Sequence, residues 1–299
     1  MSEKAYDVLD RPEVLSVLFY PRRDVSMPKV APDTFVVRIP VADNLAVGGK
    51  IYYAGAGDPV ILYFHGNGEI AADYDTIAPF YTRLGLTLFV VDYRGYGASD
   101  GSPTATTLLR DGWNCFGQLH EVMAGTDLQV GDVFVMGRSL GSAPAIEIAS
   151  RARGAIAGLI VESGFAYTFP LVERLGFLQI PDAFEHKDGF GNLDKIATIS
   201  VPTLIIHGER DWIIPIGDGD ALYETSASKD KKLVRITGGG HNDLMLIGRK
   251  AYFEAIATFC GRIAENADAD VIDEPPAKVA GLQRDEPGGS GPPLPPLKR

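Results

Sequence analysis

The sequence predicts an α/β fold in which helices cover both faces of a mostly parallel central sheet. Short apolar runs alternate along the chain with longer amphipathic stretches, as they do when crossover helices connect parallel strands. Of the 299 residues, 45% are hydrophobic and 22% are charged, which is the composition of a globular protein. One large core is expected, because α/β proteins of this length often form a single domain.

The expected strands are apolar runs that are too short to be helices. Two early segments, 34–39 and 46–53, lie on either side of Pro40 and the pair Asp43-Asn44, and predict an antiparallel hairpin at the sheet edge. The buried strands that follow are predicted at residues 60–64, 86–91, 133–136, 156–161, 203–207 and 233–236.

Two long helices are predicted from apolar residues that recur at helical spacing. The first covers 104–123, with His120 packed on its apolar stripe, and the second covers about 245–263. Their expected buried residues are Leu109, Trp113, Phe116 and Met123 in the first, and Tyr252, Ile256, Phe259 and Ile263 in the second.

Three regions are expected around this core. Residues 1–33 form an N-terminal extension that packs on the domain 34–264, and residues 265–299 carry seven of the 20 prolines and few large apolar side chains. Such a segment cannot offset its ordering entropy by burial, so it is predicted to be a disordered tail. Its end, Pro292 to Arg299, is either a polyproline II ligand for a partner protein or a solvated tail.

An aromatic-rich insert is predicted at about 163–200, between two expected strands. It is too long for a simple crossover. It forms either a short cap that covers an active site and shapes an apolar pocket, or an ordinary packing helix with loops.

Composition and charge exclude several classes of function. The net charge of −11 repels phosphate, so nucleic acid is not expected as a partner. No apolar run reaches the roughly 18 to 20 residues of a membrane helix, so stable membrane insertion is not expected. The charged N-terminus and the two isolated cysteines favour a cytoplasmic protein. No cluster has the ligand spacing of a metal site, and no cofactor is expected.

The strongest local motif is Gly-x-Ser-x-Gly at residues 137–141, placed between an apolar strand and a helix rich in small residues. This context is that of a nucleophile elbow, a tight turn that exposes a strained serine above the sheet, here Ser139. A second match, at 97–101, surrounds Ser99. It lies in a loop beyond the end of the preceding strand and is rejected as a nucleophile.

A serine hydroxyl needs a positioned base, and that base needs an acid that fixes its tautomer. Asp211 and His241 both follow predicted strands, in the chain order Ser, Asp, His that the elbow motif predicts. For Asp211 the alternative is a cap on the helix near Pro215, and Glu162 is a rival acid. A triple-glycine loop is hard to reconcile with a core histidine, which favours His241 as the base.

Acyl transfer also needs donors for the oxyanion, and two backbone N–H groups are predicted to supply them. One belongs to Leu140, directly after the nucleophile. The other belongs to Asn67, in the glycine-flanked turn after an early strand. A plain turn between a strand and a helix is the alternative explanation of the Asn67 segment.

Together these residues resemble the α/β-hydrolase superfamily, and are most similar to its compact ABHD-type or serine aminopeptidase-like members. The resemblance covers about 34–263. Its motifs lie at 64–68, 92–101, 137–141, 208–211 and 240–242. It implies the α/β-hydrolase fold, a serine hydrolase with the triad Ser139, Asp211 and His241, and an oxyanion hole formed by the backbone of Asn67 and Leu140.

The predicted reaction is hydrolysis of a carboxylic ester or thioester of small-molecule size through an acyl-enzyme, without a cofactor. Trp212 and Phe165 of the aromatic segments are predicted to contact the acyl group. The alternatives are a peptidase or amidase that uses the same triad, and a non-catalytic binding protein built on the hydrolase fold.

Overall fold

The computed structural model describes residues 6–24, 31–152 and 154–261. They form one eight-stranded sheet with the strand order β1-β2-β4-β3-β5-β6-β7-β8. The strands are β1 (Thr34–Ala42), β2 (Leu45–Tyr52), β3 (Val60–Phe64), β4 (Thr87–Val91), β5 (Val133–Arg138), β6 (Gly158–Glu162), β7 (Thr203–Gly208) and β8 (Lys231–Ile236).

Strands β1 and β2 are antiparallel to each other, and β2 is antiparallel to β4, whereas β3 to β8 pair in parallel. The hairpin occupies one edge of the sheet, as predicted, and Asn44 in its turn has a φ of 59°. The α/β fold with a mostly parallel sheet is therefore confirmed.

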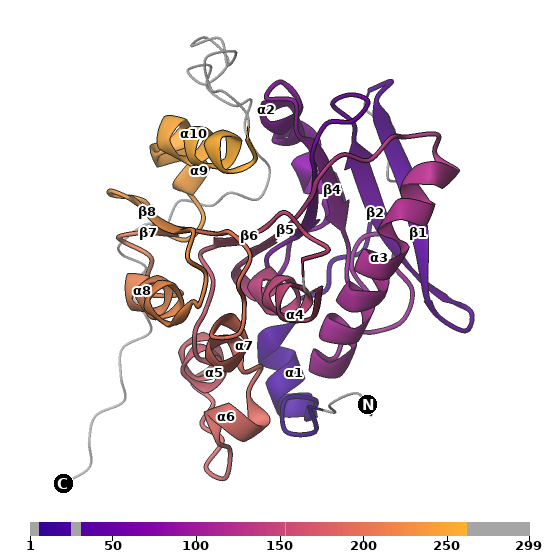
Figure 1. Cartoon of the computed structure of the whole chain (residues 1–299). Helices are drawn as coiled ribbons and strands as arrows, with labels where there is room; N and C mark the ends of the chain where they lie inside the picture. Colours follow the sequence, from indigo (N-terminus) through magenta and orange to yellow (C-terminus); the bar gives the residue numbers. More distant parts are fainter. Residues whose placement is uncertain (1–5, 25–30, 153, 262–299) are drawn as a thin grey trace, which may run out of the picture.

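Helices cover both faces of this sheet (Figure 1). Alternate residues of β3 face the two layers: Leu62 and Phe64 pack in one core cluster, and Ile61 and Tyr63 in the other. Burial on both sides explains why the strands are continuously apolar. The first layer holds α3 (Ala105–Gly125), α4 (Ser142–Ala152), α7 (Asn192–Ile196) and α8 (Ile216–Thr225), and the second holds the 3₁₀ helix η1 (Ala71–Thr76), α2 (Ala78–Thr82), α9 (Leu244–Ile247) and α10 (Arg249–Phe259).

Helix α3 is rotated from the predicted orientation. Trp113 and Phe116 are only half-buried, and His120 is exposed, so the prediction that His120 is packed was wrong. The buried face contains Gly112, where an added Cβ would lie 2.9 Å from the side chain of Pro144 in α4. This close approach sets which face of α3 meets the sheet.

The second long helix is broken. The predicted span 245–263 divides into α9 and α10 at Gly248, where an added Cβ would lie 2.4 Å from Ile236. Tyr252 and Ile256 are buried as predicted, and Ile263 lies outside the described residues.

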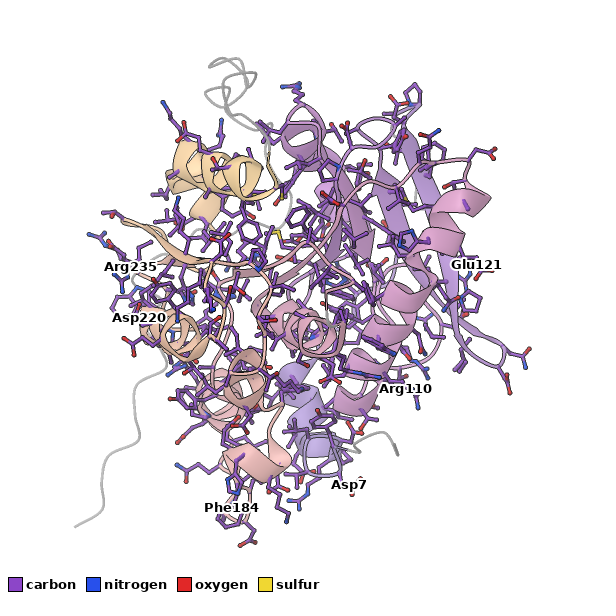
Figure 2. All side chains as sticks on the ribbon, viewed as in Figure 1. Asp7, Arg110, Glu121, Phe184, Asp220 and Arg235 are labelled. Atoms are coloured by element: carbon purple, nitrogen blue, oxygen red, sulfur yellow. The ribbon has the colours of Figure 1, made fainter. Side chains whose placement is uncertain are left out.

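The insert between β6 and β7 contains α5 (Thr168–Gly176), α6 (Glu185–Asp188) and α7. Helix α7 packs on α4 and α8 in the manner of an ordinary crossover, and α5 packs on α1 (Pro12–Leu18). Phe177 and Phe184 are exposed, and Phe184 lies at the outer edge of the molecule (Figure 2). The insert thus includes a packing helix, and its exposed aromatic residues lie in the loops on either side of α5.

Within the described part of the chain, no helix combines the length and the apolar character needed to cross a bilayer. The predicted disordered tail, 265–299, lies outside the described residues.

Candidate active site

A tight turn joins β5 to α4, and the residue at its start is Ser139, with a φ of 53°. Residues with side chains rarely adopt this left-handed conformation. Close backbone packing makes the flanking glycines necessary: a Cβ on Gly137 would lie 2.1 Å from the carbonyl oxygen of Gly141, and one on Gly141 would lie 2.0 Å from that of Phe64. The strained turn expected of a nucleophile elbow is present.

The side chains of Ser139, Asp211 and His241 form one hydrogen-bonded chain. The imidazole Nε2 of His241 lies 2.9 Å from the Oγ of Ser139, and its Nδ1 lies 2.7 Å from the Oδ2 of Asp211. The three residues follow β5, β7 and β8, and all are buried. Parallel strands end at the same edge of a sheet, which is why residues so distant in sequence meet there.

The carboxylate of Asp211 is held in its charged form. Its burial disfavours the charge, but hydrogen bonds from His207, His241 and the Ile214 amide hold its pKa well below the usual range. Its Oδ1 accepts hydrogen bonds from the N–H groups of Ile213, at 2.9 Å, and Ile214, at 2.7 Å. An ionised acceptor fixes the imidazole tautomer and stabilises an imidazolium.

The structure places the residues that were considered as alternatives in other roles or other surroundings. Helix α8 begins directly after Pro215, and no side chain caps its N-terminus. The alternative role of Asp211 as the cap of this helix was therefore wrong. The rival serine, Ser99, is buried and accepts a hydrogen bond from the Gly48 N–H at 2.8 Å, a structural link to β2. The rival acid, Glu162, accepts hydrogen bonds from Tyr252 at 2.7 Å and Tyr63 at 3.1 Å.

The loop after β3 is fastened through the side chain of Asn67. Its Oδ1 accepts hydrogen bonds from the N–H of Tyr20 and the hydroxyl of Tyr96, both at 2.7 Å. Gly68 follows with a φ of 78°, which a glycine adopts readily. Leu140 lies in the 3₁₀ turn directly after Ser139. The roles of the Asn67 and Leu140 N–H groups as oxyanion donors stay predictions.

The two residues predicted to bind substrate lie in different environments. Trp212, beside Asp211, has 77% of its surface exposed. Phe165 is 0% exposed and packs against Phe190 with ring centroids 5.8 Å apart. Phe165 is a core residue, and only Trp212 offers surface to a ligand.

Arg138 is a residue at this site that no sequence motif singled out. Its side chain is buried and donates hydrogen bonds to the backbone oxygen of His241 and to the Oδ1 of Asn242, both at 2.9 Å. The sequence did contain a signal for this residue: Arg138 ends a strand that is otherwise apolar and buried. A buried charge requires partners, so an arginine in this position indicates a cluster of polar groups around it.

Among the described residues, no group of three His, Cys, Asp or Glu side chains is arranged to hold a metal ion. One cavity lies between the sheet and α3. Its lining includes Phe64, Asp92, Arg94, Asp111 and Cys115, and contains none of the three hydrogen-bonded site residues.

The chain matches a model of the family described as serine aminopeptidase S33 over residues 56–175 and 192–245. It is 31% identical over 208 residues to the alpha/beta hydrolase domain-containing protein 17B of Homo sapiens, and these residues make up 67% of this chain and 65% of that protein. The protein of the same name from Xenopus laevis is 30% identical over the same shares. The chain therefore spans about 65% of the length of these curated relatives.

Solved structures share the fold at low sequence identity. The esterase Pf2001 of Pyrococcus furiosus has a TM-score of 0.65 and 19% identity, with 81% of this chain and 98% of that chain covered. The monoacylglycerol lipase of Paleococcus ferrophilus has a TM-score of 0.56 and 17% identity, with 72% and 98% covered. These likenesses show the fold alone.

Proposed function

The chain belongs to the serine aminopeptidase S33 family of the α/β-hydrolase superfamily. From this membership and the geometry of the site, we propose that the protein is a serine hydrolase of carboxylic esters or thioesters. Ser139 is the proposed nucleophile, His241 the base and Asp211 the acid. The observation that carries the proposal is the continuous chain of hydrogen bonds from the Ser139 hydroxyl through the imidazole to the Asp211 carboxylate.

In the proposed mechanism, the Nε2 of His241 takes the proton of the Ser139 hydroxyl while its oxygen attacks the carbonyl carbon. The tetrahedral oxyanion lies against the N–H groups of Asn67 and Leu140. His241 then gives its proton to the departing alcohol or thiol, which leaves an acyl-enzyme. His241 then takes a proton from a water molecule whose oxygen attacks the acyl carbon. It returns this proton to the Ser139 oxygen as the bond to the acyl group breaks and the acid leaves, while Asp211 stays ionised throughout.

The proposed substrate is a small acyl compound, and Trp212 is the proposed contact for its apolar part. Hydrolysis by this mechanism needs no cofactor or metal. The net charge of −11 argues against a nucleic acid partner, and a cytoplasmic location also stays a proposal. A binding partner for the proline-rich end concerns residues outside the described structure.

A fluorophosphonate probe tests the proposal, because it reacts only with an activated serine. Wild-type protein should be labelled, and Ser139→Ala should abolish labelling. The matched control is Ser99→Ala, which removes the serine of the other Gly-x-Ser-x-Gly match and should leave labelling in place. Wild-type protein that stays unlabelled would favour the non-catalytic binding role.

Peptide or amide cleavage is the second candidate, favoured by the description of the matched family as serine aminopeptidase. A comparison of kcat/KM for a p-nitrophenyl ester and an aminoacyl p-nitroanilide separates the two. Amide turnover equal to or above ester turnover would assign the chain to the peptidases.

A further inference from the structure

The guanidinium of Arg138 has partners in three segments besides its own strand. Its Nη2 lies 2.9 Å from both the backbone oxygen of His241 and the Oδ1 of Asn242. Its Nη1 donates to Glu69, and its Nε lies 3.3 Å from the Oε1 of Glu162. Only 6% of the Arg138 side chain is exposed.

These partners belong to the segments that carry the proposed chemistry. Arg138 directly precedes Ser139, and its Nη2 reaches the loop of His241. Glu69 closes the loop of Asn67, because its Oε2 accepts a hydrogen bond from the Gly66 N–H at 2.8 Å. One guanidinium therefore connects the nucleophile turn to the base loop and to the loop of the proposed oxyanion donor.

The chemistry of the cluster suits arginine and no other residue. A guanidinium offers five donors in a rigid plane, whereas a lysine ammonium offers three from a single point. Burial disfavours the charge of Arg138, but Glu69 and Glu162 hold its pKa above the usual range. The hydroxyls of Tyr63 and Tyr252 also donate to Glu162, so this buried carboxylate has several donors.

Stability alone does not explain such a cluster. Replacing buried ion pairs by apolar side chains is often neutral or stabilising, so a buried ion pair is weak evidence of a stabilising role. A role in fixing the geometry of the site accounts for an arginine whose donors are divided between separate loops.

We propose that Arg138 is a positioning residue of the hydrolytic reaction, holding the His241 loop and the Asn67 loop at fixed positions relative to Ser139. This inference rests on the proposed function. A displacement of about 1 Å at a reacting group can lower a rate by about 100-fold, so loosening either loop should lower kcat.

Two variants each weaken one connection and leave Arg138 in place. Asn242→Ala removes one of the two hydrogen bonds from Arg138 to the base loop, and Glu69→Gln removes the charge of its partner on the oxyanion loop. Each should lower kcat for p-nitrophenyl acetate by about 10- to 100-fold, with KM nearly unchanged. The control is Asp220→Asn. Asp220 on α8 forms an ion pair at the surface with Arg235 on β8 (Figure 2). Its replacement should leave kcat at the wild-type value.

Arg138→Met should lower kcat at least as much as the double variant Asn242→Ala/Glu69→Gln, because both connections pass through one side chain. Arg138→Lys should have a kcat between those of Arg138→Met and the wild type, since a lysine keeps the positive charge but offers fewer hydrogen-bond donors. If Arg138→Met fails to fold, the two single-connection variants decide.

A merely structural role would lower the unfolding temperature and leave the kcat of the folded protein unchanged. Active wild-type protein together with single-connection variants that keep the wild-type kcat would overturn the positioning role alone. Wild-type protein that neither hydrolyses the ester nor reacts with the fluorophosphonate would overturn the proposed function, and the positioning role with it.

Discussion

Gly141 lies so close to the end of β3 that a Cβ atom on it would be 2.0 Å from the carbonyl oxygen of Phe64. The contact is with backbone, which cannot rotate away. Gly141→Ala should therefore lower the free energy of unfolding by about 3 kcal/mol, as overpacking of a core does. Chemical denaturation measures this loss.

Gly117 in α3 is the control for this change, because an added Cβ there meets nothing within 4 Å. Gly117→Ala should raise the free energy of unfolding by about 0.5–1 kcal/mol, since alanine favours a helix over glycine. Equal stability of Gly141→Ala and the wild type would contradict the close packing at the elbow.

Asp211→Asn should lower kcat by about 10⁴-fold, because an amide at this position favours the wrong imidazole tautomer. The measurement is ester hydrolysis at pH 7 under saturating substrate. Asp220→Asn removes an exposed carboxylate instead and should leave kcat near the wild-type value. Comparable activity of the two variants would rule out Asp211 as the acid.

The lowered pKa of Asp211 also predicts a pH dependence of stability. A carboxyl whose pKa is lower in the folded than in the unfolded protein stabilises the fold above its unfolded pKa of about 3.9. That contribution is lost as the pH falls through the folded pKa. The difference in free energy of unfolding between wild type and Asp211→Asn should thus be largest near pH 7 and shrink below about pH 4.

Tyr96→Phe should lower kcat without unfolding the protein. The change keeps the ring but removes the hydroxyl that donates to Asn67 Oδ1, so this oxygen loses one of the two hydrogen bonds that it accepts. We expect a loss of about tenfold, measured as kcat for p-nitrophenyl acetate. Tyr6→Phe, whose hydroxyl contacts Lys195 at 3.3 Å, is a control expected to keep full activity.

Trp212→Ala should raise KM for long-chain p-nitrophenyl esters by about tenfold and change KM for the acetate little, because apolar burial grows with chain length. Phe177 is 93% exposed at the end of α5 and provides the matched control. A series from acetate to decanoate measures the effect. Identical responses of Trp212→Ala and Phe177→Ala would remove Trp212 from the substrate contacts.

Local patterns were sufficient to predict the sheet. The span of β3 was predicted at 60–64 and observed there, because both faces of the strand are buried and no polar residue interrupts it. The residues of the candidate site could also be selected from the sequence. Ser139 lies between two glycines in a strained turn, and His241 follows three glycines, so both stand in short motifs that are visible in the sequence.

Tertiary contacts determine what the sequence could not predict. The rotation of α3 follows from the approach of Gly112 to Pro144, two residues on different helices. The full burial of Phe165 follows from its packing against Phe190. The partners of Arg138 range from Glu69 to Asn242, and no local pattern indicates which buried charges will meet.

The N–H of Tyr20 that holds Asn67 lies far ahead of the matched family region, which begins at residue 56. The neighbouring segment is fastened as well: Arg22 pairs with Asp73, and its backbone oxygen accepts from the Gly97 N–H at 2.8 Å. A fragment trimmed to the family boundaries for expression or screening would lose β1, β2 and this fastening together. If such a fragment were inactive, the cause would be the loss of these segments, and the result would not count against the proposed chemistry of the chain described here.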